Sequence, residues 1–246
     1  MNTSSTGGKE TKVVFVGDAP LEGMLGWPGE PATAAPPDAE ESAGTDTRGG
    51  VVVAHPYPPH GANMDLPVVF RIAKSCRQCG FVTLRFNFRS VGGSQGTFSG
   101  TEEDRDVTAA VSFLQKKLAT VGDHGSIGLA GYSFGSIMAA RVAAELPGVK
   151  ALALVGFGVG WEGLPADTLE RLARYDGPLL AVCAENDEYG SPEDVREALT
   201  GLGLDHTMEV IQGADHFLGG RDREVGQKVA EFFSVVFGGE RSGGRE

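Results

Sequence analysis

Ser133 has glycines on both sides in the stretch Gly131-Tyr132-Ser133-Phe134-Gly135, which fits the pattern G-x-S-x-G. In this pattern a sharp turn between a strand and a helix lifts a serine hydroxyl above the edge of a sheet. The glycines lack a Cβ, so strand and helix can approach closely around a strained serine backbone. We therefore predict that Ser133 is a nucleophile.

A second stretch, Gly92-Gly93-Ser94-Gln95-Gly96, satisfies the same pattern. The chain has 37 glycines in 246 residues, so chance matches are expected. Ser133 directly follows an apolar run typical of a strand and opens an apolar run typical of a helix, as the motif requires. Ser94 instead lies in a glycine-rich segment with no helix until Thr101, and we interpret it as part of a flexible loop.

A serine hydroxyl needs a base to take its proton, and the base needs a carboxylate to orient it. Two histidines follow Ser133 in the chain, His206 and His216. His206 begins the last predicted strand, which is typical of an edge or surface residue. His216 follows that strand, where sheets of this kind place their sites, and is therefore the predicted base.

The predicted acid is Asp187, which lies three residues beyond the end of a strand predicted at 179–184. Glu185 at the same strand end is its main competitor. Asp215 adjoins His216, but neighbouring side chains on an extended stretch point in opposite directions, so Asp215 is predicted to cap the loop.

Two backbone N–H groups should stabilise the oxyanion that forms during acyl transfer. One belongs to Phe134, the residue after the nucleophile, at the amino end of a predicted helix. The other should come from the loop that starts at His55, in which three residues are prolines without an N–H group. Tyr57 is the best-placed donor there. His55 is equally well interpreted as a pocket residue or as a structural residue of the loop.

Strands and helices alternate along the chain after two short initial strands, which predicts a doubly wound α/β fold: a mostly parallel sheet with helices on both faces. Thr101 is predicted to cap one of the helices. The strands are predicted at 13–16, 21–27, 51–54, 81–88, 127–130, 151–155, 179–184 and 207–211, and the helices at 68–79, 101–118, 134–146, 192–202 and 221–237.

The predicted domain organisation is a disordered lead at 1–10, a single domain at 11–237 and a flexible tail at 238–246. Residues 28–50 are predicted to be a disordered insertion, because they are rich in proline and acidic residues and have no aliphatic side chain larger than alanine. About twenty residues separate the strands at 151–155 and 179–184, which predicts a minimal lid and an open site. Tyr132 and Trp161 are candidate pocket residues.

Several classes of protein are disfavoured by composition. The formal net charge of −12 would repel nucleic acid. No apolar run is long enough to span a membrane, and no signal-peptide pattern is seen, so a cytoplasmic location is expected. Cys76 and Cys79 form a C-x-x-C pair without a second pair of ligands, so they and Cys183 are predicted to be buried cysteines rather than metal or redox centres. No metal and no cofactor is expected.

The chain resembles the α/β hydrolases, and more narrowly a poorly characterised branch related to dienelactone hydrolases. The resemblance rests on HPYPPHG from His55, RFNFRSVGGSQG from Arg85, GYSFG from Gly131 and GADHF from Gly213, and it covers roughly 50–237. It implies a triad of Ser133, Asp187 and His216 and places Ser94 in a family loop. The chain departs from the family pattern at Tyr57, where a second histidine is usual, and at Ser90, where a glycine is usual.

These features together predict a serine hydrolase that cleaves a carboxylic ester or thioester of a small molecule through an acyl-enzyme. A peptidase of the same fold is an alternative, and so is a non-catalytic interaction protein that keeps the fold alone. The sequence gives no indication of the oligomeric state. Activity should fall in acid, because only a neutral imidazole can accept the serine proton.

Overall fold

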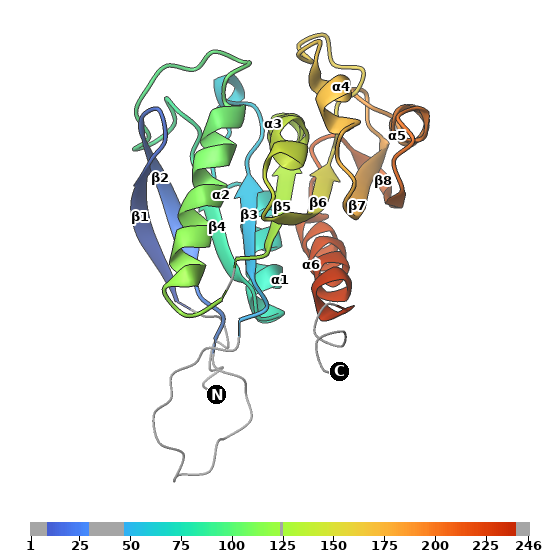
Figure 1. Cartoon of the computed structure of the whole chain (residues 1–246). Helices are drawn as coiled ribbons and strands as arrows, with labels where there is room; N and C mark the ends of the chain where they lie inside the picture. Colours follow the sequence, from blue (N-terminus) through green and yellow to red (C-terminus); the bar gives the residue numbers. More distant parts are fainter. Residues whose placement is uncertain (1–8, 30–46, 124, 240–246) are drawn as a thin grey trace, which may run out of the picture.

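The strands of the part of the chain that the structure describes form one sheet of eight strands, in the order β1-β2-β4-β3-β5-β6-β7-β8 (Figure 1). A computed structural model of the chain describes residues 9–29, 47–123 and 125–239. The strands are β1 (Glu10–Val16), β2 (Pro20–Gly26), β3 (Gly50–Ala54), β4 (Val82–Phe86), β5 (Ile127–Tyr132), β6 (Val149–Val155), β7 (Leu179–Asn186) and β8 (His206–Asp215). The first two strands pair antiparallel, β2 pairs antiparallel with β4, and the strands from β4 to β8 run parallel.

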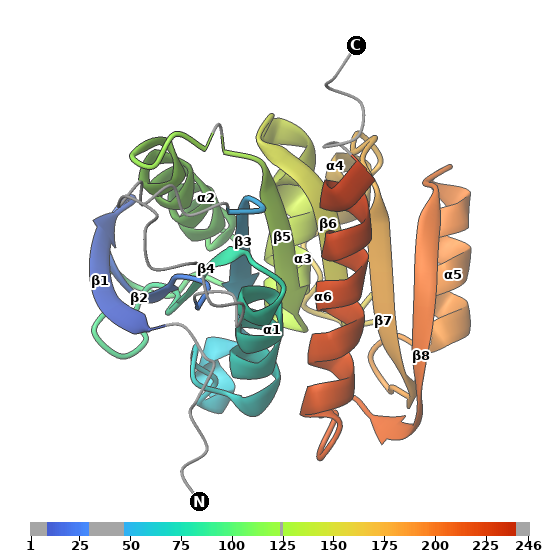
Figure 2. The same cartoon turned by 90° about the horizontal axis from the view of Figure 1, so that it is seen from below.

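The helices lie on both faces of the sheet, as predicted. They are α1 (Pro67–Gln78), α2 (Asp104–Ala119), α3 (Phe134–Val142), α4 (Thr168–Leu172), α5 (Pro192–Gly201) and α6 (Asp222–Gly239), with short 3₁₀ turns at Pro58–His60 and Ala143–Glu145. Helices α1 and α6 lie side by side on one face, and α2 and α3 cover the other (Figure 2). The predicted α/β fold is confirmed.

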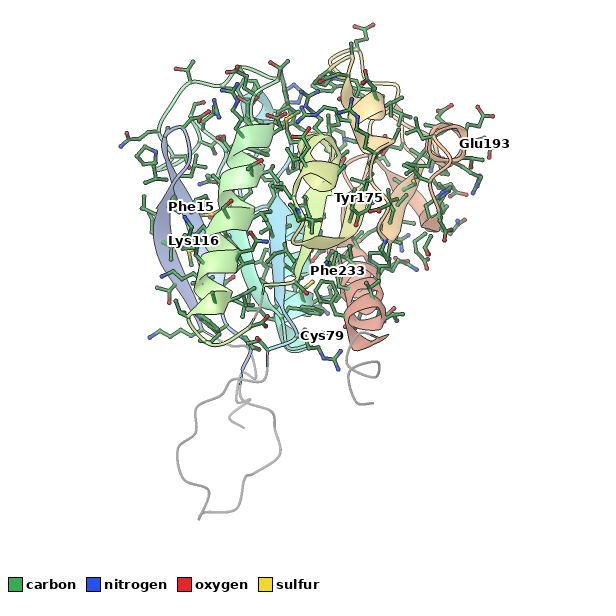
Figure 3. All side chains as sticks on the ribbon, viewed as in Figure 1. Phe15, Cys79, Lys116, Tyr175, Glu193 and Phe233 are labelled. Carbon is green, nitrogen blue, oxygen red and sulfur yellow. The ribbon has the colours of Figure 1, made fainter. Side chains whose placement is uncertain are left out.

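Each face of the sheet has its own apolar core, because successive strand side chains point to opposite faces. In β3, Val51 and Val53 belong to the core beneath α1 and α6, whereas Val52 and Ala54 belong to the core beneath α2 and α3. Figure 3 labels aromatic residues from both cores: Phe15 on β1 and Tyr175 belong to the core beneath α2 and α3, and Phe233 on α6 belongs to the other. A strand that is buried on both faces reads as a continuous apolar run, and this explains the sequence of β3.

Some predicted boundaries differ from the structure. Helix α2 begins at Asp104 rather than at a Thr101 cap, because Ser99 and Glu103 form a polar turn ahead of it. In this turn the Glu103 carboxylate accepts hydrogen bonds from the Ser99 and Gly100 N–H groups. The predicted helix at 134–146 ends in a 3₁₀ turn, and the five-residue helix α4 was not predicted.

The predicted disordered lead, insertion and tail lie mostly outside the described residues. Their predicted ranges are too long at three places. Glu10 begins β1, where its carboxylate accepts hydrogen bonds from Arg77 and Arg85. Before β3, the Arg48 N–H donates to the Gly80 carbonyl, and α6 continues to Gly239. Within the described part of the chain, no helix is both long and apolar enough to cross a membrane.

Ser90, where the sequence resemblance implies a glycine, adopts a left-handed backbone conformation with φ of 66°. A side chain costs about 1–2 kcal/mol in this conformation, whereas glycine adopts it freely. Glycine also increases the conformational entropy of the unfolded chain, which offsets part of this gain. Ser90→Gly should therefore raise the free energy of unfolding by about 0.5–1 kcal/mol. Chemical denaturation measures the change.

The matched control for Ser90→Gly is the same substitution at Ser234, inside α6. Glycine in a helix interior costs about 1 kcal/mol, so Ser234→Gly should lower the free energy of unfolding. If both variants lose stability, the left-handed conformation of Ser90 does not lower the stability of the wild-type protein, and the prediction is contradicted.

Candidate active site

The Ser133 turn has the strained geometry that the glycine spacing predicts. Ser133 lies between β5 and α3 with φ of 54° and ψ of −119°, a conformation that L-residues rarely adopt. A Cβ on Gly131 would collide with the Gly135 carbonyl, and a Cβ on Gly135 would collide with the Ala54 carbonyl. The Ser133 N–H donates to the Val155 carbonyl of β6 at 2.8 Å, which anchors the turn to the sheet.

A chain of hydrogen bonds joins Ser133, His216 and Asp187 at the carboxyl edge of the sheet. Ser133 Oγ lies 2.8 Å from His216 Nε2, and His216 Nδ1 lies 2.8 Å from both Asp187 carboxylate oxygens. Asp187 follows β7 and His216 follows β8, so the ends of β5, β7 and β8 position the three side chains. A carboxylate can only accept, so Nδ1 carries the proton and Nε2 is free to accept from the serine hydroxyl.

Two tyrosines hold the histidine in place. The Tyr132 hydroxyl donates to the His216 carbonyl at 2.9 Å. Burial, followed by the charges of Asp187 and Asp215, raises the pKa of Tyr132, so this hydroxyl keeps its proton. The Tyr189 ring packs edge-on against the imidazole with 4.7 Å between the ring centres, and the Tyr189 N–H donates to Asp187. Sequence reasoning did not find Tyr189, although it follows the predicted acid by two residues.

The alternative histidine and carboxylates have other partners. His206 lies at the opposite end of β8 from His216, and its Nδ1 contacts the Leu204 carbonyl. Glu185 is exposed and accepts from the Gly213 N–H at 2.6 Å. Asp215 is exposed and accepts from the Phe217 N–H, which is the loop-capping contact that was predicted.

Ser94, in the second glycine-flanked stretch, is buried and structural. Its hydroxyl donates to the Asn87 carbonyl at 2.7 Å and accepts from the Glu22 N–H at 2.9 Å. The interpretation of a flexible loop at this position is wrong, because these two bonds tie the loop to β2 and to the end of β4.

The two predicted oxyanion donors, Phe134 and Tyr57, both line the pocket that contains Ser133. Among the hydrogen bonds of the described residues, neither N–H donates to a protein acceptor. Phe134 begins α3, whose amino end carries partial positive charge. The Tyr57 ring packs edge-on against Phe134 and Trp161, with ring centres 5.5 and 5.3 Å apart, which fixes the loop above the nucleophile.

His55 is a structural residue of this loop rather than a pocket residue. It is fully buried and absent from the pocket wall. Its Nε2 accepts from the Phe88 N–H at 3.1 Å, so its Nδ1 carries the proton and donates to the Pro56 carbonyl at 2.7 Å. His55 therefore ties the loop of Tyr57 to the segment after β4. Burial lowers its pKa from 6.5 to about 4, and the bond to Pro56 offsets only part of that effect.

The lowered pKa of His55 predicts a loss of stability in acid. The unfolded chain binds a proton at this residue near pH 6.5, but the folded chain does so only near pH 4. Protonation of His55 therefore favours the unfolded state in this interval. As the pH falls from 6.5 to about 4, this effect alone should lower the free energy of unfolding by about 3 kcal/mol. Urea titrations at several pH values should show this additional loss in wild type and not in His55→Asn. Equal losses in the two proteins would contradict it.

A metal site would need a cluster of suitable side chains, and a redox role for the cysteines would need reactive thiols. The described residues contain no group of three or more histidine, cysteine or acidic side chains able to hold a metal ion. The three cysteines are free, and burial raises the pKa of Cys76 and brings that of Cys183 to about 12, which keeps both thiols protonated.

Comparison with known proteins decides the family. The family model described as "Alpha/beta hydrolase domain" matches residues 47–235, which include the whole candidate site. The chain belongs to this family.

Individual proteins are similar to this α/β hydrolase over most of its length. A solved alpha-beta serine hydrolase homologue from Coxiella burnetii is 29% identical, with a TM-score of 0.73, and the match covers 90% of this chain and 96% of that one. A Xanthomonas campestris structure, described as an a/b serine hydrolase without lid, is 25% identical with a TM-score of 0.73. This match covers 91% of the present chain and 93% of the Xanthomonas chain. An uncharacterized protein of Rickettsia prowazekii, RP471, is 28% identical over 75% of this chain and 78% of its own.

The hydrolase has a pocket of about 510 Å³ above Ser133, and its wall comes from both sides of the sheet edge. On the side of α3, the wall is apolar and is formed by three aromatic residues, Tyr57, Phe134 and Trp161, together with Ile137. On the side of α1 and α6, the wall is formed by Leu66–Val68, Leu218–Gly220 and Asp222. The predicted pocket residues Tyr132 and Trp161 both line it. Between β6 and β7, all of which the structure describes, α4 is the single α-helix, so the predicted minimal lid is observed.

Proposed function

We propose that this α/β hydrolase is a serine hydrolase that cleaves a carboxylic ester or thioester of a small molecule through an acyl-enzyme. The observation that supports the proposal best is the unbroken hydrogen-bond chain from Ser133 through His216 to Asp187, which opens on an apolar pocket. Such a chain activates a hydroxyl that is otherwise a weak nucleophile.

In the first half of the reaction, Ser133 Oγ forms a bond to the carbonyl carbon while its proton passes to His216 Nε2. The carbonyl electrons move onto oxygen, and the N–H groups of Phe134 and Tyr57 stabilise this oxyanion. When the oxyanion collapses, the bond to the leaving oxygen or sulfur breaks. The leaving group takes the proton from Nε2, and the acyl group remains on Ser133.

In the second half, His216 takes a proton from water, and the oxygen of that water bonds to the acyl carbon. The second oxyanion collapses with release of the carboxylic acid, and Nε2 returns its proton to Ser133 Oγ. Asp187 accepts from Nδ1 throughout and stabilises the imidazolium that forms twice in each cycle. The exposed mouth of the pocket beside Phe217 gives water access to the acyl-enzyme.

The proposal is tested by a fluorophosphonate probe, which phosphonylates an activated serine, together with para-nitrophenyl esters of short acids. We expect one adduct, located by mass spectrometry on the peptide that contains Ser133, and ester turnover that falls in acid as the imidazole is protonated. A para-nitroanilide with the same acyl group tests the peptidase alternative. Neither labelling nor turnover from about pH 5 to about pH 9 would overturn the proposal.

A further inference from the structure

The part of the pocket wall beside α1 and α6 contains a negatively charged side chain, Asp222. Of the described residues that line the pocket, Asp222 is the one carboxylate, and none is lysine or arginine. The Asp222 Oδ2 atom accepts from Arg71 Nε at 2.8 Å, and both side chains are partly exposed. Arg71 is not part of the wall, so of the two partners in this ion pair Asp222 alone belongs to the pocket lining.

Without Asp222 the same region would favour an anion. The amino ends of α1 and α6 meet there, since Pro67 and Asp222 are the first residues of the two helices and both line the pocket. Helix amino ends carry partial positive charge and attract anions. Arg71 adds a full positive charge behind the wall. The Asp222 carboxylate offsets all three contributions at the surface that a substrate contacts.

We propose that Asp222 is a specificity residue that excludes negatively charged groups from the α1–α6 side of the pocket. The part of the substrate ester that lies on this side of the pocket is then uncharged. This inference rests on the proposed function. The overall charge of −12 repels anions generally, but Asp222 belongs to the pocket wall, so its charge acts on a bound group over a shorter distance than charges elsewhere on the surface do.

Matched pairs of esters test the exclusion in wild type. On the acyl side, para-nitrophenyl pentanoate is compared with the monoester of glutaric acid, which has a carboxylate in place of the terminal methyl group. On the leaving-group side, the pentanoate of methyl para-hydroxybenzoate is compared with that of para-hydroxybenzoate. Each kcat/KM is divided by the rate of that ester with hydroxide. In at least one pair we expect the uncharged ester to be favoured by about tenfold or more.

Substitutions then assign the discrimination to Asp222. Asp222→Asn should raise the ratio of charged to uncharged ester turnover by about tenfold, because Arg71 and the helix ends are no longer offset. The double variant Asp222→Asn with Arg71→Gln should lose most of that gain. Asp205→Asn makes the same change of net charge at an exposed residue before β8, and it should leave the ratio unaltered.

The outcomes separate the two levels of the proposal. Failure to hydrolyse any uncharged ester would count against the proposed function itself. Turnover of uncharged esters with no discrimination in either pair, or an equal ratio in wild type and Asp222→Asn, would overturn the role of Asp222 alone. Thermal unfolding of each variant shows that the comparison is made on folded protein.

Discussion

Ser133→Ala should lower kcat for a para-nitrophenyl ester by about 10⁵-fold, because the alanine cannot form the acyl-enzyme. The residual rate would come from the oxyanion donors and from substrate binding, which do not depend on the hydroxyl. The substitution removes one oxygen from a half-buried side chain whose polar partner, His216 Nε2, also faces the pocket, so the fold should be retained. Steady-state kinetics and loss of fluorophosphonate labelling measure the effect.

Ser94→Ala is the matched control, because Ser94 has the same glycine spacing. The hydrogen bonds of its hydroxyl are buried, so this variant should keep turnover and labelling within a few-fold of wild type. It should lose about 1–2 kcal/mol of the free energy of unfolding, since the Glu22 N–H and the Asn87 carbonyl lose their partner. Retained labelling in Ser133→Ala, or lost labelling in Ser94→Ala, would move the nucleophile away from Ser133.

The sequence was sufficient to predict the features that depend on neighbours along the chain. The continuous apolar run of β3 reports burial on both faces, and the glycines around Ser133 report a turn too tight for a Cβ. The order of strands places Asp187 and His216 at the same sheet edge as Ser133, because parallel strands of a doubly wound sheet end together. Their mutual hydrogen bonds follow from this placement.

Features that depend on partners distant in the chain could not be predicted. Ser94 was assigned to a flexible loop because its glycine-rich surroundings contain no sign of the bonds that it makes with β2. The role of His55 depends on the Phe88 N–H, which a neighbouring strand brings beside it. Asp222 and Arg71 are 151 positions apart, and only the packing of α6 against α1 brings them together. Such contacts are tertiary, and single-sequence patterns carry no information about them.

The second large effect is expected for Asp187→Asn, which should lower kcat by about 10⁴-fold with little change in the fold. An asparagine has the same shape, and its carbonyl oxygen can still accept from the Tyr189 N–H. Its amide group, however, donates to Nδ1 where the carboxylate accepted. The imidazole then carries its proton on Nε2, where it cannot accept the proton of Ser133, and the imidazolium loses its counter-charge.

Glu185→Gln provides the control for this substitution, because Glu185 is the other acidic candidate at the end of β7. Its side chain reaches the Gly213 N–H rather than the imidazole, and a glutamine oxygen can still accept that bond. We therefore expect kcat within about twofold of wild type and a stability change below about 1 kcal/mol, as for most surface substitutions. If Glu185→Gln were the variant that lost activity, the imidazole would have to be oriented by Glu185 in the working enzyme. Because Asp187 is buried and accepts from Nδ1 through both oxygens, whereas Glu185 is exposed, the geometry favours a large effect at Asp187 alone.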